Sequence, residues 1–227
     1  MSREALTPEF WRGVRVFIFD LDGTLIDSKL DLALSVNATR GKFGLPPLPH
    51  EQVFGYIGDG APMLVRRALD HTADDTLVAD ALQFFLGYYR EHMLDNTVPY
   101  PGVREGIEAL AAGGRTLTVL TNKPERFSRL ILEGLGLAAH FRLIYGGNTF
   151  ERKKPDPIGV EATLRETGAA KEQALVVGDS EIDVQTARNA GVRVVGVSYG
   201  LGSDRLRDHP PDLMVDTLTD LAALVKS

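Results

Sequence analysis

The sequence predicts an α/β protein with a doubly wound, mostly parallel sheet and an inserted α-helical domain. Short apolar runs of strand length alternate with helical patterns over most of the chain, and one long segment near the start contains helical patterns only. Alternating strands and helices form right-handed crossovers, which place helices on both faces of a parallel sheet. The expected core is therefore Rossmann-like in architecture.

The strands are expected where apolar runs are nearly continuous, because a strand that is covered on both faces has no polar side. The clearest run is residues 14–20, which ends at Asp20. Further strands are expected at residues 116–121, 174–178 and 192–197, with weaker ones at 143–146 and 213–215. Helical periodicity predicts helices at residues 103–112, 125–135, 157–166, 182–190 and 218–225.

Residues 26 to 98 break this alternation, and no strand is expected there. Breaker clusters at residues 46–49, 55–60 and 74–75 separate three stretches with helical spacing. About 70 helical residues are too many for one crossover, so we expect a core of residues 1–25 and 98–227 and an inserted domain of residues 26–97. The spaced residues are Leu30, Ala33, Leu34, Ala38, Leu64, Ala68, His71, Leu77, Ala81, Phe85, Tyr88 and His92, of which both histidines are expected to pack and not to bind.

Composition describes an ordinary globular chain of 227 residues, with 44% hydrophobic and 25% charged residues. A net charge of −6 gives no general attraction to nucleic acid or anionic lipid. The absence of cysteine excludes disulfides and thiolate ligands, and it fits a reducing compartment. The first ten residues contain no apolar run, and no window reaches the roughly 18 apolar residues of a membrane span. We expect a cytoplasmic monomer or homodimer with neither nucleic acid nor membrane as partner.

Chemically active residues stand where the expected strands end. The carboxyl ends of parallel strands meet at one edge of a sheet, where ligands bind in open α/β proteins. Carboxylates, a hydroxyl, a side-chain amide and a lysine should therefore converge at this edge. The residues are Asp20, Asp22, Thr121, Asn122, Lys154, Asp179 and Asp183.

Each of these pieces also has a structural explanation. Thr121 and Asn122 precede a proline and could cap a helix. Asp183 follows Ser180 at capping-box spacing, and Lys154 could belong to a solvated loop. Because all of them fall at the same edge of the sheet and in chain order, the combination favours a catalytic site.

The ordered set resembles a known superfamily. Asp20-Leu-Asp22-Gly23-Thr24, Thr121-Asn122, Lys154-Pro-x-Pro and Gly178-Asp179-x3-Asp183 resemble the four motifs of the haloacid dehalogenase-like hydrolases, whose inserted helical domain is a cap. Three further segments, at residues 56–60, 121–124 and 197–200, resemble the phosphoglycolate phosphatase branch. An acid at Asp22 argues against carbon–halogen cleavage, because the dehalogenases of this superfamily lack it.

The resemblance implies a Mg²⁺-dependent phosphatase. Asp20 would attack phosphorus and form an aspartyl-phosphate, and Asp22 would act as general acid and then general base. The metal ligands would be the side chains of Asp20 and Asp179 and the backbone carbonyl of Asp22. Thr121, Asn122 and Lys154 would bind the phosphoryl oxygens, with Lys154 also beside Asp20. Gly23, which permits a sharp turn, would support the site from behind together with Thr24 and Asp183.

The substrate is expected to be a small phosphorylated metabolite, and the resemblance points to 2-phosphoglycolate. Arg66 and Arg67 follow the glycine-rich loop of residues 55–60, and an arginine fork suits a carboxylate. Alternatively, both arginines are solvated residues of a helix surface. Phosphatases acting on pyrophosphate, nucleotides or sugar phosphates and sugar-phosphate mutases share the same core residues. A signalling module that is phosphorylated on aspartate remains an alternative of another class, as does a catalytically idle binding protein.

Overall fold

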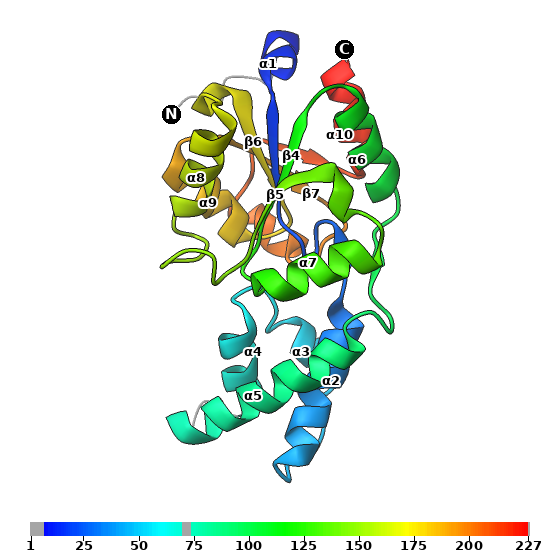
Figure 1. Ribbon diagram of the computed structural model, residues 1–227, viewed down its shortest axis with the longest axis vertical. Coiled ribbons are helices and arrows are strands. Elements are labelled where there is room, and N and C mark those ends of the chain that lie inside the picture. The colour runs from blue at the N-terminus through cyan, green and yellow to red at the C-terminus, as the bar shows by residue number, and fades with distance from the viewer. Residues whose placement is uncertain (1–6, 70–73, 227) are drawn as a thin grey trace. The chain divides into compact units, whose positions relative to one another are not determined.

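One part of the chain forms a six-stranded sheet in the order β5-β4-β1-β6-β7-β8 (Figure 1). The computed structural model describes residues 7–69 and 74–226, so that His71 lies outside the described residues. Every neighbouring pair in this sheet runs parallel, which confirms the predicted α/β class. The strands are β1 (Val16–Phe19), β4 (Thr116–Leu120), β5 (Phe141–Tyr145), β6 (Ala174–Gly178), β7 (Arg193–Val197) and β8 (Leu213–Val215).

Helices cover both faces of the sheet, with α8 and α9 on one side and α6 and α10 on the other (Figure 1). A further helix, α1, was not expected. It begins where the Thr7 hydroxyl accepts a hydrogen bond from the Phe10 amide at 3.3 Å, with proline at the first helical position. The helices are α1 (Pro8–Gly13), α6 (Val103–Ala112), α7 (Glu125–Gly134), α8 (Ile158–Thr167), α9 (Glu181–Ala190) and α10 (Leu218–Lys226).

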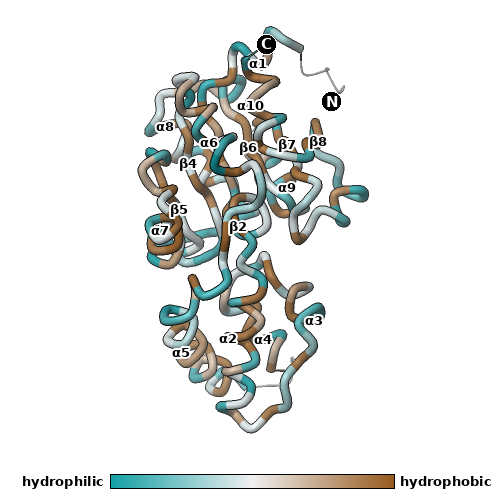
Figure 2. Tube along the Cα trace, turned by 90° about the vertical axis from the view of Figure 1, so that its right-hand side faces the viewer, coloured by the Kyte–Doolittle hydropathy of each residue, from teal (hydrophilic) through white to brown (hydrophobic). Residues whose placement is uncertain are grey.

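The two faces of β1 belong to different halves of the core, because successive side chains of a strand point to opposite faces. Val16 and Ile18 pack in a buried cluster with residues of β6, β7, α8 and α9. Phe17 and Phe19 lie on the other face, with ring centroids 6.1 Å apart. All four side chains are buried, and the sheet strands are coloured mainly as hydrophobic in Figure 2. Burial on both faces explains why the run has no polar alternation.

The register of the central strands places the expected site residues side by side. β1 lies between β4 and β6, and Phe19 is opposite both Val119 and Val177. The chain leaves β1 toward β4 on one side and returns through β6 on the other, so the strand order reverses at β1. Ligands bind beyond the carboxyl ends of strands at such a reversal. The residue after β1, Asp20, therefore stands between the ends of two neighbouring strands.

The described structure divides into two compact units, one of residues 1–25 and 99–227 and one of residues 26–98. The second unit contains α2 (Lys29–Lys42), α3 (His50–Phe54), α4 (Ala61–Ala68) and α5 (Asp75–His92). The expectation that residues 26 to 98 hold no strand was wrong at both ends. There β2 (Ile26–Asp27) and β3 (Val98–Pro99) pair as two-residue strands, too short to carry a periodic pattern.

The buried Asp31 joins the two ends of the helical unit. Its carboxylate accepts hydrogen bonds of 2.7–3.0 Å from the backbone and side chains of Asn96 and Thr97. Each of these bonds is charge-assisted, which compensates for burying the charge.

None of the helices in residues 7–69 and 74–226 combines the length and the apolar character that crossing a bilayer requires.

Two helix glycines give a matched test of packing. A Cβ at Gly106 in α6 would lie 2.6 Å from Leu218 Cβ and 2.7 Å from its backbone, whereas a Cβ at Gly87 in α5 meets nothing within 4 Å. We expect Gly106→Ala to destabilise the protein by about 1–2 kcal/mol, because overpacking exceeds the gain in helix propensity. Gly87→Ala should stabilise its helix by about 0.5–1 kcal/mol.

Urea unfolding measures both effects. Fluorescence of Trp11, the single and buried tryptophan, follows the sheet unit, and far-UV circular dichroism follows the helices. A midpoint that rises in Gly106→Ala contradicts the close helix contact between α6 and α10.

Candidate active site

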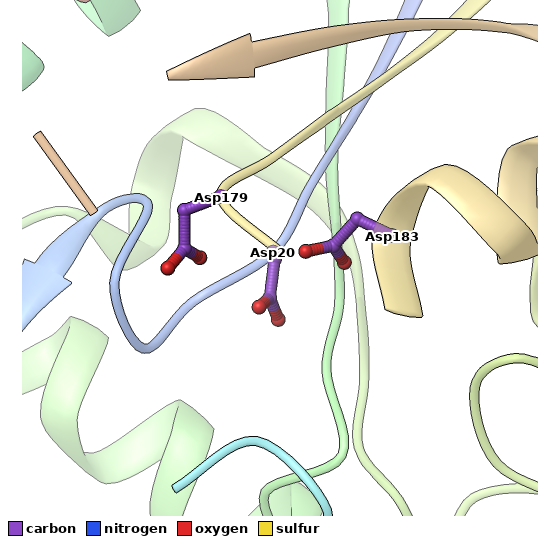
Figure 3. A group of neighbouring side chains, drawn as sticks. All are labelled: Asp20, Asp179 and Asp183. Atoms are coloured by element: carbon purple, nitrogen blue, oxygen red, sulfur yellow. The ribbon is translucent and has the colours of Figure 1, made fainter. Parts of the chain in front are cut away.

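Three carboxylates converge at the carboxyl edge of the sheet. Asp20 follows β1, Asp179 follows β6, and Asp183 lies in the first turn of α9 (Figure 3). One carboxylate oxygen of each lies within 4.8 Å of the others. The backbone amide of Asp20 donates to the Val177 carbonyl at 2.9 Å, so that the chain after β1 is fixed against β6.

Lys154 brings a buried positive charge to this group. Its ammonium lies 2.8 Å from Asp20 Oδ1 and 2.6 Å from Asp183 Oδ1. Burial alone lowers the pKa of Lys154, but the charges of Asp183 and Asp20 outweigh it and raise the pKa above its ordinary value. The lysine is therefore a permanent cation in the site, and its burial rules out the solvated loop as its structural explanation.

Asp183 serves two partners with its two oxygens. Oδ2 accepts hydrogen bonds from the Ser180 amide at 3.1 Å and the Ser180 hydroxyl at 2.6 Å, as in a capping box. Oδ1 accepts from Lys154 at 2.6 Å. Asp183 therefore both caps α9 and contacts Lys154. With these bonds in place, Asp183 offers less to a metal ion than Asp20 or Asp179 does.

Asp179 is oriented from two sides. Its Oδ1 accepts from the Thr24 hydroxyl at 3.0 Å, and its Oδ2 accepts from the Gly202 amide at 2.9 Å. Gly23 has φ +90°, and a Cβ there would lie 2.3 Å from Asp179 Oδ2. Glycine is therefore required at residue 23 both by its backbone conformation and by the space that Asp179 takes.

The electrostatics of the cluster fit a cation. Burial raises the pKa of Asp20 to about 6. The charge of Lys154 lowers this pKa in part, and the charge of Asp183 raises it. Burial and the charges of Asp183 and Asp20 raise the pKa of Asp179 to about 8, against hydrogen bonds from Gly202 and Thr24. The ammonium of Lys154 contacts Asp20 and Asp183, and Asp179 is the third carboxylate of the group, so negative charge is in excess. Hard oxygen donors with excess negative charge suit Mg²⁺, and the residues present therefore fit such an ion.

Asp22 has a partner that the sequence prediction did not name. The ammonium of Lys123 lies 2.9 Å from Asp22 Oδ1 and 3.1 Å from Oδ2, and the lysine side chain is 5% exposed. Lys123 directly follows the expected pair Thr121 and Asn122, which was the only signal for it. Its direction toward Asp22 depends on the pairing of β1 with β4.

Thr121 and Asn122 lie buried at the end of β4. The Thr121 hydroxyl accepts from the Lys123 amide at 3.2 Å, and the Asn122 side-chain amide donates to the Lys154 carbonyl at 3.2 Å. Neither residue caps α7, whose first amide, that of Glu125, donates to Asn148 Oδ1 at 2.9 Å. Asn122 therefore ties the end of β4 to the segment that carries Lys154, and Thr121 stabilises the turn after β4.

The loop after β7 also contributes to the site. The Tyr199 hydroxyl donates to the Thr24 carbonyl at 2.8 Å. A Cβ at Gly200 would lie 2.1 Å from Asp179 Cβ and 2.5 Å from the Gly23 carbonyl oxygen. The role of this loop was not predicted, because the sequence shows a turn there and not what the turn contacts.

Arg66 and Arg67 lie at the end of α4 in the helical unit. Arg66 pairs with Asp75 at 2.6 Å, and Arg67 pairs with Asp59 at 2.6 Å and donates to the Tyr56 carbonyl at 3.0 Å. Arg67 thus braces the loop of residues 56–59 within its own unit. In the same unit His92 stacks on Tyr88, with ring centroids 4.2 Å apart, and pairs with Asp95.

The sequence of this chain is similar to those of known proteins. The family model described as haloacid dehalogenase-like hydrolase matches residues 17–197. The chain is 42% identical over 214 residues to the phosphoglycolate phosphatase of Pseudomonas syringae pv. syringae (strain B728a), covering 91% of this chain and 78% of that protein. It is 40% identical over 218 residues to the phosphoglycolate phosphatase of Chromobacterium violaceum, covering 94% and 97%.

A solved structure agrees with these matches. It is described as a predicted phosphoglycolate phosphatase from Haemophilus somnus 129PT, and it is 33% identical to this chain with a TM-score of 0.89. The match covers 93% of this chain and 98% of that one. The chain belongs to the haloacid dehalogenase-like hydrolase family, as an enzyme of the phosphoric monoester hydrolase class.

Proposed function

We propose that this phosphatase hydrolyses 2-phosphoglycolate through an aspartyl-phosphate on Asp20, with Mg²⁺ as its metal. The observation that carries the mechanism is the Asp20 carboxylate at the end of β1, which is 13% exposed, lies 2.8 Å from the ammonium of Lys154 and is grouped with the carboxylates of Asp179 and Asp183. The substrate is proposed from the relatives of 40–42% identity that are named phosphoglycolate phosphatases.

The first half-reaction is the transfer of the phosphoryl group to the protein. A carboxylate oxygen of Asp20 forms a bond to phosphorus as the bond from phosphorus to the glycolate oxygen breaks. Asp22 gives a proton to that oxygen, because an alkoxide is a poor leaving group. Lys154, Thr121 and Asn122 hold the phosphoryl oxygens and place them for attack in line.

The second half-reaction returns Asp20 to its free form. Asp22, now a carboxylate, takes a proton from water as the water oxygen attacks phosphorus, and inorganic phosphate leaves. The side chains of Asp20 and Asp179 and the backbone carbonyl of Asp22 would hold Mg²⁺. When bound, this ion supplies positive charge that reduces the repulsion between the anionic nucleophile and the anionic phosphoryl group.

The helical unit is proposed to be the cap that selects the leaving group, with residues 26–97 as cap and residues 1–25 and 98–227 as catalytic core. The core residues engage only the phosphoryl group and the metal, so selection has to come from elsewhere. We propose that Arg66 or Arg67 binds the carboxylate of the substrate. A small metabolite as partner, a cytoplasmic location and a monomer or homodimer complete the proposal.

The nucleophile is tested by substitution. We expect Asp20→Asn to lose activity to background, because an amide does not attack phosphorus, while circular dichroism shows the fold retained. Asp22→Asn should lose much activity but less, since its metal contact is through the backbone. Free phosphate released from a phosphate-ester panel is the readout, which also separates hydrolysis from transfer to a second hydroxyl. Asp20→Asn activity within roughly tenfold of the parent contradicts the assignment.

The metal is tested by removal. Excess chelator should stop turnover, and Mg²⁺ should restore it, because the carboxylate cluster then has its counter-charge again. Asp179→Ala should raise the Mg²⁺ concentration that gives half-maximal activity and weaken Mg²⁺ binding in calorimetry. Asp204→Ala removes the same charge at an exposed position and serves as control. Full turnover in excess chelator refutes the metal proposal.

The leaving-group proposal is tested with 2-phosphoglycolate and ethyl phosphate, which differ by the carboxylate. A charged hydrogen bond out of water contributes roughly 1.5–3 kcal/mol, so kcat/KM should favour phosphoglycolate by on the order of ten- to a hundredfold. Arg66→Met or Arg67→Met should remove the preference and leave ethyl phosphate hydrolysis nearly the same. Equal efficiency on the parent ends the phosphoglycolate proposal.

Arg67 requires a further control because it also braces its loop. Asp59→Asn removes the ion-pair partner of Arg67 and keeps the guanidinium. If Asp59→Asn loses the preference as fully as Arg67→Met does, the loop and not a direct contact of Arg67 is responsible. A preference that survives in both arginine variants places the carboxylate site elsewhere in the chain.

A further inference from the structure

The ion pair between Lys123 and Asp22 is part of the site but has no place in the scheme above. The ammonium lies almost equally far from the two carboxylate oxygens, at 2.9 and 3.1 Å. The lysine side chain is 5% exposed and the aspartate side chain 14%. A buried ammonium this close to both oxygens restricts the rotation of the carboxylate more than a solvated contact does.

The backbone of Lys123 is fixed independently of Asp22. Its amide donates to the Thr121 hydroxyl at 3.2 Å, and its carbonyl accepts from the Gly147 amide at 2.9 Å. The segment after β5 lies so close that a Cβ at Gly147 would be 2.4 Å from the Asn122 carbonyl oxygen. The lysine therefore projects from a rigid turn, and it can impose its position on the carboxylate rather than follow it.

The contact with Lys123 determines where the two carboxylate oxygens of Asp22 lie. Each carboxylate oxygen has two lone pairs, so each keeps one after the contact with Lys123. Asp22 held in this way is a positioned base, which is the form required when water attacks the aspartyl-phosphate.

We infer that Lys123 is a positioning residue, which holds Asp22 as the base for hydrolysis of the phosphorylated Asp20. In this step the water oxygen bonds to phosphorus, and the bond from phosphorus to Asp20 breaks with its electron pair returning to the Asp20 carboxylate. The proton of the water passes to Asp22. The inference rests on the proposed function, because it requires the covalent intermediate.

Direct binding of the phosphoryl group by Lys123 would have a different effect on the kinetics. If its ammonium bound the phosphoryl oxygens directly, its loss would slow formation of the phosphoenzyme from every ester. A positioning role slows breakdown instead, and it slows formation only from esters whose leaving group needs a proton. Acetyl phosphate separates the two roles, since acetate leaves without one.

The experiment follows single turnovers of acetyl phosphate by rapid acid quench with Mg²⁺ present, in the parent, Lys123→Met, Lys123→Arg, Asp22→Asn and Lys171→Met. Formation and decay of the protein-bound phosphoryl group are measured separately. Lys171→Met removes the same charge at an exposed residue that precedes β6, away from the carboxyl edge.

In Lys123→Met the decay should slow on the order of ten- to a hundredfold, with formation within roughly threefold of the parent and phosphoenzyme accumulating. Asp22→Asn should show the same pattern more strongly, Lys123→Arg should recover part of the decay rate, and Lys171→Met should match the parent. Combining Lys123→Met with Asp22→Asn should slow decay no further than Asp22→Asn alone.

Two outcomes overturn the inference: an unchanged decay rate in Lys123→Met, or equal losses in formation and decay. If Lys123→Met does not fold, Lys123→Gln is measured against the same criteria. The proposed mechanism itself is refuted if the parent forms no phosphoenzyme and Asp22→Asn behaves as the parent does. Slow decay in Asp22→Asn with normal decay in the Lys123 variants refutes only the role of Lys123.

Discussion

The structure of the site depends on one constraint: three carboxylates converge beside one buried ammonium, that of Lys154, at the point where the strand order reverses. Asp20 and Asp179 are neighbours because β1 pairs with β6, and burial together with the nearby charge of Asp183 raises the pKa of both. Such an arrangement is unfavourable for folding unless positive charge offsets it. The lysine supplies part of this charge, and the remaining negative charge suits the site to a divalent cation, which would also offset the charge of an anionic substrate.

The surrounding residues keep these charges from moving apart. Asp183 joins the start of α9 to Lys154, and Thr24 and Gly202 hold the two oxygens of Asp179. Gly23 and Gly200 allow two loops to approach Asp179 more closely than any side chain permits. Lys123 and Asp22 form a second, separate ion pair. The two lysines thus have different acidic partners, and in the proposed mechanism one pair binds the phosphoryl group and the other transfers protons.

Much of the fold could be predicted, because strand and helix periods are local properties of the sequence. The bounds expected for β6, β8 and α6 agree with the structure residue for residue. Short elements were missed, since α3 and the two-residue strands span less than one full period of any pattern. That Asp20, Asp179 and Lys154 meet could be predicted from parallel topology, but the contact of Lys123 with Asp22 required the actual register and side-chain direction.

The central claim is that the phosphoryl group passes through Asp20. It is tested most directly by quenching the enzyme in acid during turnover of 2-phosphoglycolate with Mg²⁺, reducing the acyl phosphate with borohydride and locating the product by tandem mass spectrometry. We expect homoserine at position 20 and at no other aspartate. Reduction at Asp22 or Asp179, or none at all while turnover proceeds, would contradict it.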